Sequence, residues 1–343
     1  MWTALVGSIG LARASILRLI EAASRNASAA GVPSLARRLS AALAQTRRPR
    51  LGAVSDDAVA EEFAKRLSRT DEESASVLAK LLDKTQLKAV GTLVDQVTPV
   101  RELDYPRHRI EILISSPAIL TRLGSVEKEP FTVDWIERSI KSGDVFYDIG
   151  ANVGPYSLIA AKVTGNGARI FAFEPSASSF RDLSRNVLLN GCAESIVSLP
   201  LALWSDTGLL SFTLRSLAAG ASRHRISREV GSKRPLTETI LGLRLDDLVE
   251  RFGTPVPTHA KIDVDGYELE VLRGAERTLV RPEWRSIIIE LDPQESERNR
   301  SVKALLANAG FDHGVRHERE ASHRYPNPEK RPDVYWTFTR SAA

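Results

Sequence analysis

The sequence predicts an α/β fold with a mostly parallel sheet that is covered by helices on both faces. Apolar runs typical of buried strands alternate with amphipathic helical patterns from about residue 107 onward. One run, Val145-Phe146-Tyr147, ends in an acid and leads through a glycine-rich bend into a helical pattern. Charged residues gather where the apolar runs end, and ligands bind at this edge of parallel sheets.

The whole-chain composition is that of a globular protein without disulfides. The 343 residues are 43% hydrophobic and 26% charged, and they include a single cysteine, Cys192. One cysteine cannot form an intramolecular disulfide, which fits a reducing compartment. No apolar run is long enough to cross a bilayer. A cytoplasmic location is therefore expected.

The first hundred residues differ from the rest. Residues 1–50 carry eight Arg and one Glu, which is +7, so the remaining chain is −3 against the total of +4. Residues 1–23 form an amphipathic helical pattern that could rest on a membrane surface or on the protein itself. A basic linker and a second helical stretch, residues 56–97, follow. We expect a helical N-terminal region over residues 1–100 and one domain over residues 101–343.

The elements of that domain follow in order from the periodicity of apolar residues. Residues 108–116 read as a strand, and residues 129–144 read as a helix with Thr132 as a plausible N-cap. The key strand at 145–149 comes next, with its helix. The further predicted strands are 168–175, 194–204, 259–266, 285–293 and 333–340, and the further predicted helices are 176–191, 267–280 and 301–311.

The end of the key strand excludes two common nucleotide sites. It reads Asp148-Ile-Gly150-Ala-Asn152-Val-Gly154, so Asn152 occupies the position where a dinucleotide fold needs its second glycine. No Gly-Lys-Ser/Thr follows, which excludes a P-loop. An acid that faces the ligand suits a cation better than a phosphate.

The next strand ends in Glu174, 26 positions after Asp148. A carboxylate at this place is the expected acceptor for both hydroxyls of a ribose. A ribose, a cation and no phosphate together describe S-adenosylmethionine.

Two later strands bring more charge to the same edge. Residues 259–266 place Lys261, Asp263 and Asp265 on one side by period-two alternation, and Glu290 ends a further strand. Three charges on one face of a buried strand would be costly unless they met ligands or each other. A role in the site is therefore expected for them.

The chain resembles the FkbM-type S-adenosylmethionine-dependent methyltransferases over residues 108–295. The similarity lies in "GDVFYDIGANVGPYSLIAA", "IFAFEPSASSFRDLSRNVLLNG", "LPLALWSDTGLLSF", "LRLDDLVE" and "AKIDVDGYELEVLRGAE", with "EPFTVDWIE" before and "IIIE" after them. The usual family residue at Asp265 is Glu. The resemblance implies a Rossmann-like class I methyltransferase fold with a seven-stranded sheet, and S-adenosyl-L-methionine as the methyl donor.

The resemblance also implies roles for individual residues. Asp148, Gly150, Asn152 and Gly154 would surround the methionine part of the donor, with Glu174 at the ribose. Ala202 and Leu203 would lie beside the adenine. The family methylates hydroxyl oxygens of sugars, glycans and secondary metabolites, so O-methyl transfer to a small-molecule or glycan hydroxyl is implied.

Asp263, Asp265 and Glu290 are candidates for the group that removes the hydroxyl proton. Lys261 could hold one of these acids ionised or steady a developing alkoxide. No ligand spacing demands a metal, so none is assigned. The arginines near residue 223 could recognise an acidic glycan or form a solvated loop.

Other functions stay open at this point. One is a catalytically inactive member that binds the donor or a partner protein. An NAD-dependent oxidoreductase is disfavoured by Asn152. Nucleic-acid methylation is disfavoured because no aromatic-acid-Pro-Pro tetrad occurs and the chain after residue 50 is net negative.

Overall fold

A sheet of seven strands organises the domain. The computed structural model describes residues 99–222, 224–229, 236–291, 296–318 and 334–340. Within these residues the strand order is β12-β13-β11-β10-β3-β4-β5. The bounds are β3 Val145–Ile149, β4 Arg169–Phe173, β5 Ile196–Leu199, β10 His259–Ile262, β11 Ser286–Leu291, β12 His313–Glu318 and β13 Val334–Thr339. The strands from β11 to β5 are parallel, and β13 is antiparallel to both of its neighbours. The predicted mostly parallel sheet is confirmed.

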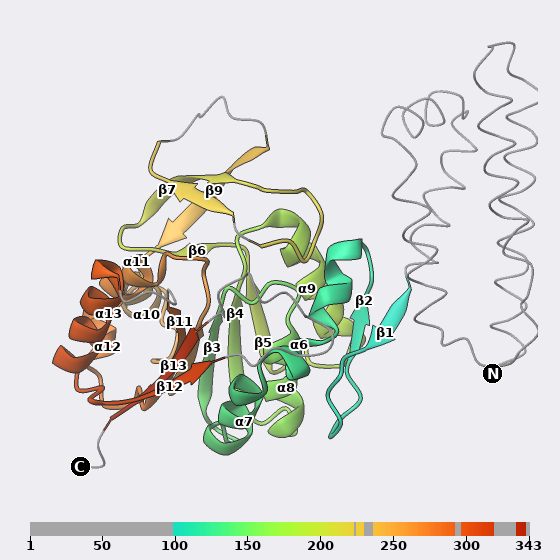
Figure 1. The fold of residues 1–343 in the computed structure, drawn as a ribbon, viewed down its shortest axis with the longest axis horizontal. Coiled ribbons are helices and arrows are strands. Elements are labelled where there is room, and N and C mark those ends of the chain that lie inside the picture. Colours follow the sequence, from blue (N-terminus) through green and yellow to red (C-terminus); the bar gives the residue numbers. More distant parts are fainter. Residues whose placement is uncertain (1–98, 223, 230–235, 292–295, 319–333, 341–343) are drawn as a thin grey trace, which may run out of the picture. The chain divides into compact units, whose positions relative to one another are not determined.

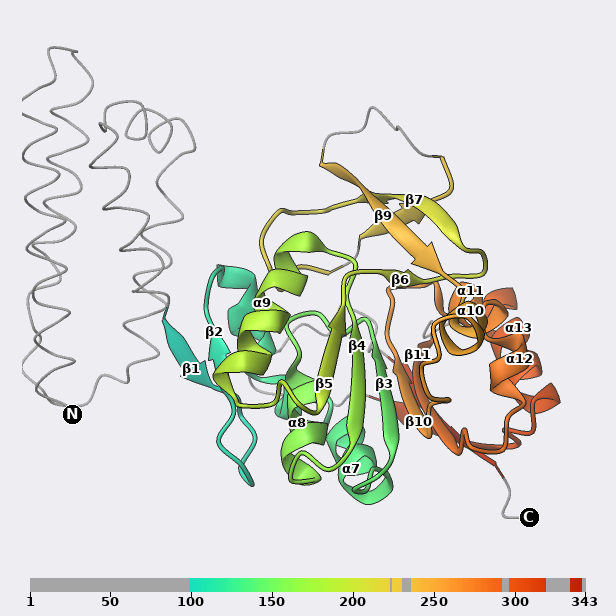
Figure 2. The same cartoon turned by 180° about the vertical axis from the view of Figure 1, so that it is seen from behind.

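Helices cover both faces of this sheet because strand side chains alternate in direction. Phe146 of β3 packs in one hydrophobic cluster with α7, α8 and α9, whereas Tyr147 packs in another with α10 to α13. Figures 1 and 2 show these two sets of helices on opposite sides of the sheet. The bounds are α6 Ser125–Lys128, α7 Pro130–Ser139, α8 Pro155–Val163, α9 Ala177–Leu189, α10 Leu245–Glu250, α11 Glu268–Arg273, α12 Glu276–Leu279 and α13 Glu297–Asn308.

A second sheet was not predicted. Among the described residues, four strands pair in the order β6-β9-β7-β8, with β6 Ala202–Leu203, β7 Gly208–Thr213, β8 Arg225–Ser227 and β9 Thr237–Leu243. The prediction treated residues 194–204 as one strand. In the structure, β5 ends at Leu199 and β6 begins at Ala202 in the other sheet, with two residues between them. Pro200 separates them because it has no N–H to donate to a ladder. Figure 1 shows the small sheet above one end of the large sheet.

Other predicted elements are moved or divided. Residues 108–116 contribute only β2, Glu111–Leu113, which pairs with β1, Val100–Glu102, outside the large sheet. Thr132 lies within α7, whose N-cap is Glu129, and a 3₁₀ helix, η1, spans Pro117–Arg122. The predicted helix at 267–280 is two short helices, α11 and α12. The predicted N-terminal region, with its amphipathic first helix and possible membrane contact, lies outside the described residues. None of the helices in the described part is long and apolar enough to cross a membrane.

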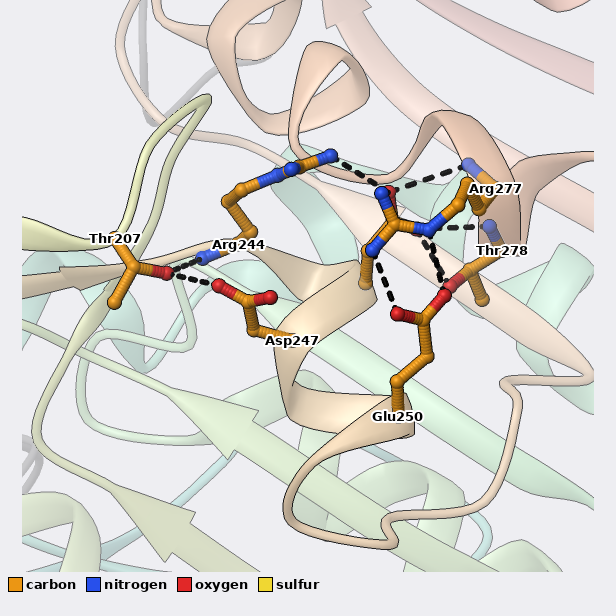
Figure 3. Close-up of polar contacts among 7 residues, drawn as sticks. Thr207, Arg244, Asp247, Glu250, Arg277 and Thr278 are labelled. Carbon is orange, nitrogen blue, oxygen red and sulfur yellow. Dashed lines mark hydrogen bonds and ion pairs between the residues drawn. The ribbon is translucent and has the colours of Figure 1, made fainter.

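A buried carboxylate of α10 bonds to Arg244 and to Thr278 of α12, and both of these partners are labelled in Figure 3. Asp246 is fully buried and accepts hydrogen bonds from the backbone N–H and the hydroxyl of Thr278, both at 2.8 Å. Its other oxygen lies 2.9 Å from Nη2 of Arg244. Glu250 pairs with Arg277 nearby, but both of these side chains are half exposed. Asp246 therefore fixes this helical layer, while the Glu250 pair lies at its surface.

Replacing Asp246 with Ala is expected to lower the free energy of unfolding by about 3–5 kcal/mol, because it leaves buried donors and a partly buried guanidinium unpaired. The Glu250→Ala variant is the matched control, and we expect a much smaller change because exposed ion pairs contribute little. Urea denaturation of both variants measures the difference. Equal losses in the two variants would contradict this account of Asp246.

Candidate active site

A cavity lies between the carboxyl ends of β3, β4 and β10 and the four-stranded sheet. Its free space is about 770 Å³, including the part that is open to solvent. Gly150, Glu174 and Asp263 line it from the large sheet. Phe212 and Ile226 line it from the small sheet. The cavity is thus at the edge where the sequence predicted a site.

The loop after β3 reaches the cavity through two residues with left-handed backbone conformation. Gly150 has a φ of 85° and Asn152 a φ of 53°. Asn is one of the few non-glycine residues that adopts this conformation readily. The Asn152 side chain donates to the Ala221 carbonyl at 3.0 Å and accepts the Val153 N–H at 3.0 Å. Asn152 therefore connects the loop after β3 to the segment that contains Ala221, which also lines the cavity.

Asp148 and Gly154, which were predicted to surround the ligand, do not line the cavity. Asp148 is fully buried within β3, and its Oδ2 accepts a hydrogen bond of 2.6 Å from Ser157 of α8. Burial raises the pKa of Asp148, although Lys261 acts in the opposite direction. Gly154 is the N-cap of α8 with a φ of 92°. Asp148 and Gly154 therefore support the conformation of the loop after β3 without lining the cavity.

Glu174 presents its carboxylate to the cavity from the end of β4. The backbone N–H of Asn152 donates to Oε2 at 2.9 Å, and that of Ser176 donates to Oε1 at 2.7 Å. Each carboxylate oxygen has two lone pairs, so one on each oxygen remains for a ligand. Burial raises the pKa of Glu174 to about 7, although the two backbone donors favour the ionised form.

Ala202 and Leu203 line the next part of the wall together with Phe173 and Leu201. All four side chains are apolar and buried. This surface suits a flat, weakly polar ring such as a base.

Of the four predicted catalytic residues, Asp263 and Asp265 line the cavity, whereas Lys261 and Glu290 do not. The strand β10 ends at Ile262, so the predicted alternation stops before Asp265, whose φ is 53°. The next residue fixes this turn. The Gly266 N–H donates to Glu268 at 2.9 Å, and its carbonyl accepts from Arg298 at 2.8 Å.

A buried network of charges supports Asp263. Lys261 is 1% exposed and donates to Asp263 Oδ2 at 2.8 Å, and Tyr335 also donates to Oδ2, at 3.3 Å. Burial alone would raise the pKa of Asp263, but Lys261, a hydrogen bond with Glu290 and the charge of Lys128 together outweigh burial and hold that pKa well below its usual range. Burial would lower the pKa of Lys261, but Asp263, Asp148 and Glu129 together raise it. The pair therefore stays charged.

Two charged residues near Asp263 and the cavity were not predicted from the sequence. Glu129 is 1% exposed and bonded to Lys128 at 2.7 Å, and its charge acts on Lys261. Arg122 lines the cavity from the end of η1. Neither residue stands at the end of a strand of the large sheet, so the strand-end pattern does not mark them. The described arginines near residue 223 are exposed and do not line the cavity: Arg215, Arg225 and Arg228.

The chain is similar in sequence to known methyltransferases. Residues 148–313 match the family model described as the methyltransferase FkbM domain. The chain is 30% identical to hexuronic acid methyltransferase AglP of Haloferax volcanii, over 57% of this chain and 75% of that protein. It is 28% identical to methyltransferase sdnD of Sordaria araneosa, over 54% and 81%. It is 26% identical to 31-O-demethyl-FK506 methyltransferase FkbM of Streptomyces tacrolimicus, over 50% and 74%.

Proposed function

This chain belongs to the FkbM family of methyltransferases, and from that premise we propose that it transfers a methyl group from S-adenosylmethionine to a hydroxyl oxygen of a sugar. The sugar is free or part of a glycan or secondary metabolite. Among the relatives, AglP is named for hexuronic acid and FkbM for a demethylated FK506. Both names support an oxygen-rich small-molecule or glycan acceptor rather than a nucleic acid.

The observation that carries the proposal is the free edge of the Glu174 carboxylate. Glu174 lines the cavity, and each of its oxygens accepts one backbone N–H and keeps one lone pair, so that the pair of oxygens fits the two hydroxyls of a ribose. Gly150 and Asn152 would lie along the methionine part of the donor, with Ala202 and Leu203 beside the adenine. When bound, S-adenosylmethionine supplies a methyl group on a positively charged sulfur, which leaves as a neutral thioether.

The acceptor hydroxyl must lose its proton, and we assign this task to Asp265. It lines the cavity, and an Asp carboxylate can accept a proton at neutral pH. Asp263 is a weaker base because Lys261 holds its pKa far below the usual range. Lys261 acts from behind Asp263 and keeps it ionised. Glu290 interacts with Asp263 and supports it from β11.

The proposal is tested by methyl transfer from isotope-labelled S-adenosylmethionine to a panel of free sugars and glycosides. We expect labelled products in which the methyl group is an ether, which mild alkali leaves intact. Methyl esters, which mild alkali hydrolyses, or methylated amines would contradict transfer to a hydroxyl. Asp265→Asn is the catalytic control.

Donor binding is expected to depend on the ionisation of Glu174. Only the carboxylate can accept hydrogen bonds from both ribose hydroxyls, so the pKa of about 7 links binding to loss of a proton. Affinity for S-adenosylhomocysteine should therefore rise about tenfold from about pH 6 to about pH 8 and then level off. Calorimetry in two buffers of different ionisation enthalpy should detect the proton released on binding below the pKa.

The control for this pH dependence is Glu174→Gln, which does not titrate. We expect weaker binding with a flat pH profile. A profile that rises equally in the variant would assign the titration to another group in the cavity.

A further inference from the structure

Arg122 lines the cavity and has no anionic partner in the described part of the chain. Its Nε and Nη2 both donate to the Gly220 carbonyl, at 3.1 and 3.0 Å, which fixes the plane of the guanidinium. None of the described carboxylates lies within 4.0 Å of this group. The Nη1 group has no hydrogen-bond acceptor among the described residues. A guanidinium with such a free edge favours a bound carboxylate or phosphate.

The contact with Gly220 also places Arg122 near the loop after β3. Asn152, in that loop, donates to the carbonyl of Ala221 at 3.0 Å. Ala221 directly follows Gly220, so Arg122 and Asn152 are bonded to adjacent carbonyls of one segment. The guanidinium therefore lies near the loop to which we assign the methionine part of the donor.

Asp263 brings the opposite charge to the same loop. Its backbone N–H donates to the Ile149 carbonyl at 3.1 Å, and its side chain is 22% exposed and lines the cavity. A carboxylate has about four lone-pair sites, and those of Asp263 are partly occupied by Lys261, Tyr335 and Glu290. These partners outweigh burial and hold the pKa of Asp263 well below its usual range. The side chain therefore offers a ligand an acceptor site on an ionised carboxylate.

The register of the large sheet places Asp263 relative to the ribose site. Glu174, Gly150 and Asp263 directly follow the last residues of β4, β3 and β10, and those last residues are paired in register. Strands are about 4.8 Å apart, so Glu174 and Asp263 are separated by two strand spacings, roughly 10 Å. In the donor, a thioether chain separates the ribose from the amino-acid end and can span this distance above Gly150.

We propose that Arg122 and Asp263 hold the amino-acid end of the methyl donor, with Arg122 at its carboxylate and Asp263 at its ammonium group. This inference rests on the proposed function and adds two donor-binding residues to it. A cation and an anion that are not paired with each other match a zwitterion. A ligand with a single charge would leave one of the two protein charges without a partner. Asp263 thus serves the donor, while Asp265 faces the acceptor hydroxyl.

The experiment is a calorimetric titration of the full chain with four ligands. S-adenosylhomocysteine carries both charges, and 5′-methylthioadenosine, which lacks the amino-acid part, carries neither. The decarboxylated analogue of S-adenosylhomocysteine keeps only the amine, and the deaminated analogue keeps only the carboxylate. Wild-type protein should bind S-adenosylhomocysteine about tenfold or more tightly than each of the other three, because each of them lacks at least one charged hydrogen bond.

Variants assign the two charges to the two residues. Arg122→Gln should weaken S-adenosylhomocysteine and the deaminated analogue about tenfold or more, and should not weaken the two ligands without a carboxylate. Arg122→Lys should restore part of the affinity. Asp263→Asn should instead weaken S-adenosylhomocysteine and the decarboxylated analogue, and should not weaken the two ligands without an amine. The control Arg228→Gln, at an exposed arginine paired with Asp206, should bind all four ligands as wild type does.

Equal binding of S-adenosylhomocysteine and 5′-methylthioadenosine by wild-type protein would overturn the proposal. So would an Arg122→Gln variant that weakens all four ligands equally or none of them. If Asp263→Asn does not fold, the wild-type series still tests the ammonium contact, which is excluded if the deaminated analogue binds as tightly as S-adenosylhomocysteine. Failure of the proposed function looks different, since none of the four ligands would then bind wild-type protein.

Discussion

Replacing Asp265 with Asn is expected to lower kcat by about 10²–10⁴-fold, the range for loss of a general base. The amide has nearly the same shape but cannot take the hydroxyl proton. Asn also tolerates the left-handed conformation at this position, where φ is 53°, so the turn should persist. We therefore expect a much smaller change in donor affinity. Turnover and donor binding, measured on the same preparation, separate the two effects.

The companion variant Asp263→Asn shows why the two acids differ. It would leave Lys261 buried without its carboxylate partner, so we expect lower stability as well as lower activity. Asp265→Asn should keep wild-type stability. If Asp265→Asn kept more than about a tenth of wild-type kcat, the assignment of the base would fail.

Replacing Gly150 with Ala is expected to lower the free energy of unfolding by about 3–5 kcal/mol and to abolish donor binding. A Cβ at this position would lie 2.0 Å from the backbone oxygen of Asp263, and the φ of 85° is strained for any residue with a side chain. Neither atom can move without separating the loop after β3 from the end of β10. Urea denaturation and a donor titration measure the two losses.

Substitutions at two other glycines separate the effect of backbone strain from the effect of the steric contact with Asp263. Gly143 has a φ of 89° with nothing within 4 Å of an added Cβ, so Gly143→Ala should show only the backbone strain, about 1–2 kcal/mol. Gly208 has neither the positive φ nor a close neighbour, so Gly208→Ala should be close to neutral. Equal effects of Gly150→Ala and Gly143→Ala would contradict the proposed contact with Asp263.

Most strands of the large sheet could be predicted because they are buried on both faces, whereas β12 was missed because nearly all of its residues are exposed. Continuous apolar runs such as residues 145–149 are unambiguous, and β3 is buried throughout. The four-stranded sheet was missed because β6 and β8 are short and β7 and β9 are partly exposed, so they carry no such signal. Leu209 and Leu241 pair across β7 and β9 yet are exposed. Helix α12 was not separated from α11 because Gly274 was treated as part of one helical pattern.

Whether a predicted site residue lines the cavity depends on its position relative to the end of its strand. Residues just beyond a carboxyl end, such as Glu174 and Asp263, line the cavity. Asp148 and Lys261 lie within their strands, and their side chains are buried. Sequence alternation alone does not show where the strand stops. Arg122 could not be predicted, since its place at the cavity depends on how η1 packs against the segment that contains Gly220.

The most direct test of the methyl-donor site is a calorimetric titration with S-adenosylhomocysteine, with NAD as the control ligand. We expect wild-type protein to bind S-adenosylhomocysteine with a Kd on the order of micromolar and NAD not at all. Glu174→Ala should weaken binding about 100-fold, because two hydrogen bonds to a charged group are lost. Glu194→Ala, at an exposed position, should bind as wild type does. No binding to folded wild-type protein, or equal binding by Glu174→Ala, would contradict the account.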